Sequence, residues 1–146
     1  LESLATDSNG TLYAIPESPP TGESTYPIYK LNNKKWEVMA KIKPTQDFLI
    51  SDAHFMPNND LLLLERAYDW SSGFRTQLRV LKIYGNTIKK QYKILELESG
   101  KYNHEGVSIW KNEFGSYFLT IISDNNFIPF ITTEIREFKL LSGNKN

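Results

Sequence analysis

The chain repeats one pattern three times, and this repetition constrains the fold more than any other feature. Each repeat opens with an acidic residue and an apolar run, followed by a turn rich in Asn or Gly, a second apolar run and a second acidic residue. The opening acidic residues are Glu2, Asp52 and Glu105, spaced about 50 residues apart. Repeats of this length that consist of short strands are typical of the blades of a β-propeller.

The apolar runs are rich in β-branched and aromatic residues and are separated by Asn, Gly and Pro, which predicts strands rather than helices. Third strands are expected at 28–31, 80–83 and 137–140, and fourth strands at 36–42 and 90–97. The sequence therefore predicts an all-β fold of about three four-stranded antiparallel blades, the last of which lacks its outer strand. The blades are expected at roughly 1–45, 46–100 and 101–146.

Three blades cannot close a ring, because propellers typically have four to eight of them. We therefore expect residues 1–146 to form one partial propeller domain, the C-terminal half of a larger six-bladed domain. The missing half would come from the remaining blades of the parent chain or from a second copy of this chain. A β-sandwich is the alternative fold, but it does not require a motif to recur at equal spacing.

Composition excludes several classes of function. Lys plus Arg and Asp plus Glu number 17 each, so no overall positive charge attracts nucleic acid or an anionic membrane. No apolar run is long enough to span a bilayer. The chain has no Cys, which excludes thiolate zinc sites and Cys nucleophiles. It also lacks the G-x-S-x-G, Walker and dinucleotide-binding motifs, so any charge selectivity or catalysis must come from a local cluster.

A second acidic residue follows the second strand of each repeat: Glu17, Glu65 and Asp124. In an antiparallel hairpin the start of one strand lies beside the end of the next, so we expect the two acids of each repeat to lie together. The first strands of a propeller line its central channel. We therefore expect all three pairs of acids to lie together at one end of that channel. A ring of carboxylates suits a hard cation such as Ca²⁺. The predicted metal ligands are Glu2, Glu17, Asp52, Glu65, Glu105 and Asp124.

The alternative is that these acids are structural. Acids at the base of a hairpin often accept backbone N–H groups or pair with a nearby Arg, here Glu65 with Arg66 or Arg75. His54 and His104 each lie within two residues of an opening acid, and a lone His is more often a hydrogen-bonded structural group than a functional one.

Two segments rich in aromatic residues flank the acids. Residues 67–74 lie between Arg66 and Arg75 and could bind an anion or a ring at the channel mouth. Residues 125–130 form either a binding rim or a hydrophobic plug between blades. Both compositions also suit packed surface loops.

Several strings in the chain resemble the phytase-like family, which is also described as the esterase-like activity of phytase family. They lie at 2–5, 10–13, 51–57, 61–66, 103–107, 121–127 and 137–140. The sequences L-L-L-L-E-R at 61–66 and I-S-D-N-N-F at 122–127 are the more specific of them, whereas the E-G-V opening occurs in many propellers. The resemblance covers nearly the whole chain.

This resemblance implies a propeller exported from a bacterial cell, to the periplasm or beyond, that hydrolyses phosphate or carboxylic esters with Ca²⁺ as cofactor. Glu105 and Asp124 would then be catalytic, and Arg66, His54 and His104 would bind a small anionic ester. In such a site the cation would polarise the ester oxygen and lower the pKa of a bound water.

Two departures and two rival functions remain open. Asn125 stands where the family pattern has a second Asp, which removes one carboxylate. If the resemblance holds, we also expect roughly the first half of the domain to lie outside these 146 residues. A non-catalytic module that binds a ligand or a protein, and a purely structural half-propeller, are the alternatives to a hydrolase.

Overall fold

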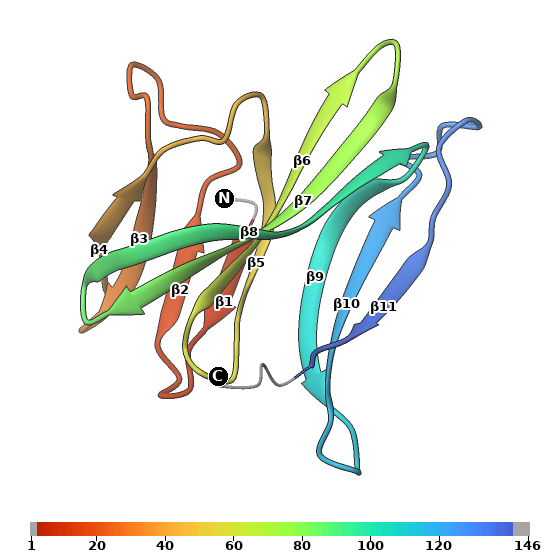
Figure 1. Cartoon of the computed structure of the whole chain (residues 1–146). Helices are drawn as coiled ribbons and strands as arrows, with labels where there is room; N and C mark the ends of the chain where they lie inside the picture. Colours follow the sequence, from red (N-terminus) through yellow and green to blue (C-terminus); the bar gives the residue numbers. More distant parts are fainter. Residues whose placement is uncertain (1–2, 142–146) are drawn as a thin grey trace.

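The computed structural model describes residues 3–141, and this part of the chain is all-β, with eleven strands in three antiparallel sheets (Figure 1). The first sheet contains β1 (Ser3–Thr6), β2 (Leu12–Ile15), β3 (Tyr26–Asn32) and β4 (Lys35–Ile42). The second contains β5 (Leu49–Phe55), β6 (Leu61–Asp69), β7 (Gly73–Tyr84) and β8 (Thr87–Gly100). The third contains β9 (Asn103–Lys111), β10 (Tyr117–Asp124) and β11 (Ile135–Lys139). The described residues include no helix that could cross a membrane.

The connectivity of each sheet is that of a propeller blade. Strands that follow one another in sequence are neighbours in the sheet, in the orders β1-β2-β3-β4, β5-β6-β7-β8 and β9-β10-β11. The first strands of successive sheets also lie together, because β1 contacts β5 and β5 contacts β9 (Figure 1). The all-β prediction, with blade-like sheets and a third sheet of three strands, is therefore confirmed.

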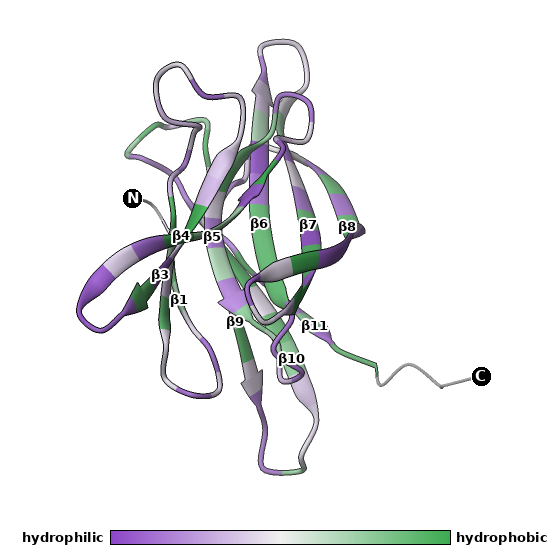
Figure 2. Ribbon diagram, turned by 90° about the vertical axis from the view of Figure 1, so that its left-hand side faces the viewer, coloured by the Kyte–Doolittle hydropathy of each residue, from purple (hydrophilic) through white to green (hydrophobic). Residues whose placement is uncertain are grey.

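The run of four leucines in β6 explains how the second sheet packs between the other two. Successive residues of a strand point to opposite faces of the sheet. Leu61 and Leu63 accordingly enter a core shared with the first sheet, and Leu62 and Leu64 enter a core shared with the third. All four side chains are fully buried, and in Figure 2 the run is an apolar stretch in the middle of the molecule. Burying each such side chain contributes about 1.5–3 kcal/mol.

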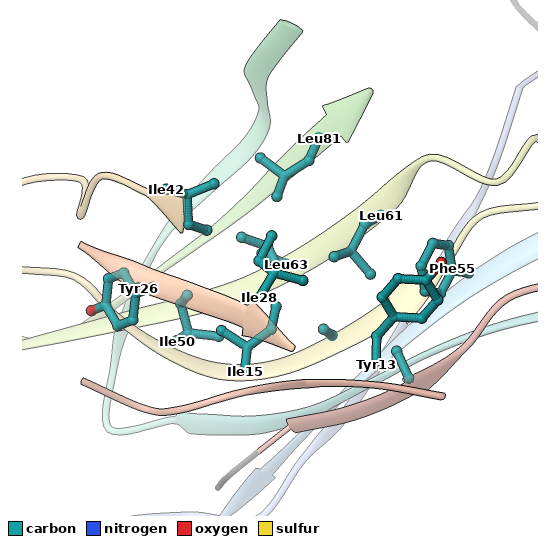
Figure 3. Close-up of a cluster of buried hydrophobic side chains, with 12 residues drawn as sticks. Tyr13, Ile15, Tyr26, Ile28, Ile42, Ile50, Phe55, Leu61, Leu63 and Leu81 are labelled. Atoms are coloured by element: carbon teal, nitrogen blue, oxygen red, sulfur yellow. The ribbon is translucent and has the colours of Figure 1, made fainter. Parts of the chain in front are cut away.

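The core between the first and second sheets combines aliphatic and aromatic side chains from both. Figure 3 shows Tyr13 beside Phe55, and their ring centroids are 4.8 Å apart. The other labelled members are Ile15, Tyr26, Ile28, Ile42, Ile50, Leu61, Leu63 and Leu81. The core between the second and third sheets is aliphatic and includes Leu62, Leu64, Leu78, Val80, Val107, Leu119 and Ile121.

The outer faces of the first and third sheets carry apolar side chains that are exposed, unlike those on the covered faces. Leu4, Trp36 and Val38 are exposed on the first sheet, and Ile122 and Ile135 are exposed on the third. Both outer faces thus carry apolar side chains that have no neighbouring sheet among the described residues. They are the surfaces on which further blades of a ring would pack.

Candidate functional site

Each of the three sheets contributes to one polar cluster beside the first strands. Arg66 of β6 donates from Nη2 to Glu17 Oε1 at 3.0 Å and from Nη1 to Asn103 Oδ1 at 3.1 Å. The same Nη2 lies 3.8 Å from Glu105 Oε1. Glu17 follows β2 of the first sheet, and Asn103 and Glu105 belong to β9 of the third. We call these four residues the Arg66 cluster.

A β-bulge places Glu105 in this cluster. The register of β9 and β10 shifts between Ile122, which is opposite Gly106, and Ser123, which is opposite His104. Glu105 is therefore the extra residue of the bulge and has no direct partner across the ladder. Bulges of this kind re-aim side chains and are common beside active sites. Here the bulge leaves Glu105 beside Arg66 rather than paired within its own sheet.

Hydrogen bonds hold the cluster in place. The side chain of Asn103 is buried and donates from Nδ2 to Glu105 Oε1 at 2.5 Å. The carbonyl of Glu17 accepts the Ile50 N–H at 3.2 Å, which ties the segment after β2 to β5. The Arg66 side chain therefore lies between two carboxylates that are themselves anchored to different sheets.

The cluster remains open to solvent and carries more negative than positive charge. The side chain of Arg66 is 25% exposed, and those of Glu17 and Glu105 are half-buried. One guanidinium faces two carboxylates, and among the described residues the buried Nε of Arg66 has no hydrogen-bond partner. An open, preorganised group of two carboxylates and one guanidinium can move a proton and stabilise a developing negative charge.

Glu65, the neighbour of Arg66 in sequence, is not part of this cluster. Its side chain is fully buried on the opposite face of β6, where it forms an ion pair with Arg79 and accepts from Gln77 Nε2 at 2.7 Å. Burial raises the pKa of Glu65, and the Arg79 guanidinium opposes that rise. Arg79 also donates to the Lys43 carbonyl at 3.2 Å. This sealed pair joins β6 and β7 to the segment that follows β4.

Asp52 also has a structural position. Its Oδ2 accepts the Val107 N–H at 2.8 Å, and its Oδ1 accepts the Ala53 N–H at 2.8 Å. Burial raises the pKa of Asp52, and these two hydrogen bonds oppose the rise. Asp52 is opposite Leu64 in the ladder, so it faces β9, whereas Glu65 faces the first sheet. The two acids of the second repeat, which we expected to lie together, are on opposite faces of their sheet.

Asp124 lies at the exposed end of β10, opposite Asn103 in the register. Its carboxylate accepts the Asn126 N–H at 3.2 Å and so closes the turn that begins there. The structure thus brings Glu17 and Glu105 together around Arg66, but Asp124 caps a turn instead of sharing a contact with them.

His104 lies in a buried position with structural contacts, and the substrate contact that we predicted for it from the sequence stays a prediction. Its ring is fully buried, with Nδ1 2.8 Å from Thr76 Oγ1 and Nε2 3.1 Å from Glu134 Oε1. Burial lowers the pKa of His104, and the hydrogen bond to Glu134 opposes that change. A neutral ring that donates from Nε2 and accepts at Nδ1 satisfies both contacts. His54 is half-buried on β5, and burial lowers its pKa as well.

The acids in the described part of the chain do not fit the expected calcium site. Between residues 3 and 141, no group of three or more His, Asp or Glu side chains is arranged to hold a metal ion. Calcium prefers six to eight oxygen ligands, and a guanidinium occupies the space between the two open carboxylates. Glu2 lies outside the described residues. Calcium binding therefore stays a prediction, and we derive no chemical step through a metal.

A mostly apolar groove adjoins the cluster, and Arg66 lines both. The groove has a volume of about 760 Å³. The β6–β7 hairpin contributes Tyr68, Trp70 and Phe74 to its lining, and the loop before β11 contributes Ile128, Phe130 and Ile131. Lys101 also lines the groove. The two aromatic segments that flank the acids in the sequence thus both contribute residues to one groove.

Sequence reasoning missed Asn103 and chose the wrong partners for Glu65. Arg79 lies two residues beyond Gln77, the direct neighbour of Glu65 across the ladder, and so shares its face. Arg66 points to the other face, and Arg75 instead pairs with Asp47 at 2.5 Å. Side chains alternate between the two faces along β7, and this alternation is the sequence signal that could have identified Arg79 as the partner of Glu65. No comparable pattern marks Asn103, whose role depends on the approach of β9 to β6.

The fold and the cluster together define a propeller segment with a polar site formed by three adjacent blades. A family model described as "Phytase-like: Esterase-like activity of phytase" matches residues 1–127 of the chain. The chain therefore belongs to the phytase-like family, as the strings in its sequence predicted, and this supports a hydrolase-like propeller segment. No curated protein and no solved structure matches it.

Proposed function

We propose that this chain is part of a phytase-like hydrolase that binds and cleaves an ester at the Arg66 cluster. The observation that carries the proposal is the convergence of three sheets on one guanidinium: Glu17, Arg66 and Glu105 come from the first, second and third sheets. Active sites of multi-element folds are commonly assembled from residues that distant segments bring together. Membership of the phytase-like family supports ester hydrolysis as the class of reaction.

In the proposed mechanism, Glu105 is the general base. Its carboxylate takes a proton from water as the water oxygen attacks the carbonyl carbon or the phosphorus of the ester. Arg66 stabilises the negative charge that develops on the ester oxygen. When the bond to the alcohol breaks, protonated Glu105 returns its proton to the departing oxygen. Glu17 positions Arg66 by its hydrogen bond at 3.0 Å.

Hydrolysis is tested with the full-length protein, by which we mean this chain together with any remaining blades of its parent. The assay measures the release of 4-nitrophenol from 4-nitrophenyl acetate and from 4-nitrophenyl phosphate. Loss of a general base lowers kcat by about 100-fold or more, so Glu105→Gln should do so. Glu113→Gln is the matched control, because Glu113 is exposed in the β9–β10 turn and should change nothing. Equal activity in the two variants, or no turnover of either ester by the wild type, would refute the proposal.

Binding without catalysis is the second candidate function, and the groove beside Arg66 favours it. Two of its side chains, Trp70 and Phe130, are almost wholly exposed within one mostly apolar groove, so a bound apolar group would cover them. Saturable binding of an ester analogue together with no turnover would select this function.

We also propose that further blades, or a second copy of the chain, cover the outer faces of the first and third sheets. The exposed side chains on these faces, such as Trp36 and Ile135, lie where a neighbouring blade packs in a ring. Light scattering of the purified chain should therefore give a mass above 16.9 kDa, or show an unstable particle. A stable monomer that unfolds cooperatively would contradict this part of the proposal.

A further inference from the structure

The groove beside the Arg66 cluster continues the site along one face of β6. Arg66 and Tyr68 are two residues apart, so their side chains lie on the same face, about 7 Å apart along the strand. An ester bound with its reactive oxygen at Arg66 would thus extend one substituent over Tyr68. Tyr68 stacks edge-on against Trp70, with ring centroids 5.7 Å apart, and packs on Phe74 at 4.8 Å.

Backbone contacts hold the two sides of the groove together. Thr132 N–H donates to the Lys101 carbonyl at 3.1 Å, which fixes the loop that carries Ile128 and Phe130 to the turn between β8 and β9. Gly73 has a φ of +81°, and a Cβ at this position would lie 2.4 Å from the Gly100 oxygen. The hairpin end can therefore approach β8 so closely only because residue 73 has no side chain. These contacts position both sides of the groove relative to each other.

The charges of the site select against highly anionic ligands. The positive charge of Arg66 is already matched by Glu17 and Glu105, and Lys101 is the other cation that lines the groove. A phosphate ester would bring two further negative charges toward these carboxylates, which costs free energy at short range. An uncharged ester meets no such repulsion, and its apolar part can be buried against Tyr68, Trp70 and Phe130.

We propose that the substrate is an uncharged carboxylic ester whose apolar acyl or aryl group lies in this groove. The reaction in this inference rests on the proposed function, whereas the binding of the apolar group rests on the groove alone. Phe130, which is 85% exposed, and Trp70, which is 93% exposed, would be covered by the bound group.

The first test measures kcat/KM of the full-length protein for 4-nitrophenyl esters of increasing acyl length, from acetate to octanoate. Each buried methylene should raise kcat/KM by about fourfold until the groove is filled. Phe130→Ser should flatten this dependence, so that kcat/KM falls much more for octanoate than for acetate. Phe114→Ser is the matched control, because Phe114 is 83% exposed but precedes β10, at the opposite end of that strand from Phe130. A length dependence that is absent, or the same in both variants, would overturn the inference and leave the proposed hydrolysis standing.

The second test measures binding without turnover. In a Trp36→Phe/Trp110→Phe background, Trp70 is the one tryptophan left among residues 1–146, so a change in fluorescence that depends on it can be identified with a further Trp70→Phe variant. N-(4-nitrophenyl)octanamide, which carries a quenching nitrophenyl group and an amide in place of the ester, should quench this fluorescence saturably. Phe130→Ser should abolish saturation and Phe114→Ser should not. Saturable quenching in a protein that cleaves no ester would support the groove and refute the proposed hydrolysis, and unsaturable quenching in all variants would refute the groove.

Discussion

Glu65 and Arg66 are consecutive residues of β6, yet each belongs to an acid–arginine contact of a different kind. Glu65 meets Arg79 in a sealed pair, with side chains 0% and 7% exposed, between the second sheet and the segment after β4. Arg66 meets Glu17 and Glu105 on the opposite face, at the open end where three sheets converge. Alternation along one strand thus separates a structural site from a candidate catalytic one.

The comparison shows that burial, and not the type of residue, distinguishes the two sites. The side chains of the sealed pair are almost wholly buried, and their charges are matched by each other and by neighbouring polar groups such as Gln77. The Arg66 cluster can exchange its contacts for those of a ligand, because water already reaches all three charged groups. Stability should therefore depend on the first site, and activity on the second.

The largest effect on stability is expected from breaking the sealed pair. Glu65→Gln leaves the Arg79 charge buried without a carboxylate, which should lower the free energy of unfolding by about 3–5 kcal/mol. Glu105→Gln in the open cluster is the matched change and should cost about 1 kcal/mol or less. Urea unfolding of the full-length protein, in which the remaining blades cover the outer sheets, measures both.

A double replacement sharpens this prediction. Glu65→Met with Arg79→Leu removes both charges, so it should be much less destabilising than Glu65→Gln alone. If Glu65→Gln unfolds no more easily than Glu105→Gln, the two sites do not differ in the way that their burial indicates.

An intermediate effect is expected at Asp52, whose carboxylate connects β5 to β9. Asp52→Ala leaves the Val107 N–H without its acceptor and should lower the free energy of unfolding by about 1–3 kcal/mol. Asp52→Asn keeps an acceptor oxygen and should cost less. The same loss in both variants would show that the hydrogen bond to Val107 does not link the sheets.

The smallest effect concerns pH. The pKa of His104 lies below its usual 6.5 in the folded chain, because its ring is buried. The unfolded chain consequently binds a proton first as the pH falls below about 6.5, so stability should decrease from there down to the folded pKa. Unfolding measured between about pH 7.5 and about pH 5 should show this slope, and His104→Gln should reduce it. If the free energy of unfolding of His104→Gln depends on pH as steeply as that of the wild type, groups other than His104, such as His54, cause the dependence.

The sequence predicted the blades well because their signals are local. The recurring turns and the apolar run 61–64 identify hairpins, and a strand that is apolar on both faces must lie between two layers. The site was harder to predict, because a shift of one residue moves a side chain to the other face. Asp52 and Glu65 are close along their hairpin, but the register sets Asp52 opposite Leu64 and so separates them.

The sequence could not show the contacts that cross between sheets. Arg66 and Glu105 were both predicted as site residues, and the structure brings them together, but the bulge that frees Glu105 depends on the β9–β10 register. Asn103 and Glu17 meet Arg66 only because three sheets approach one another there. Such contacts join residues 37 and 49 positions apart, which no local pattern encodes.

The most direct test of the account measures activity and stability together in Arg66→Met. This change keeps much of the apolar stem and removes the guanidinium that Glu17 and Glu105 share. We predict that kcat/KM for 4-nitrophenyl butyrate falls by about 100-fold or more. The free energy of unfolding should fall by no more than about 2 kcal/mol, mainly because the buried Asn103 Oδ1 loses its donor, and so by less than for Glu65→Gln. Unchanged kcat/KM with a loss of several kcal/mol would contradict the account, because it would make the Arg66 cluster a structural site like that of Glu65.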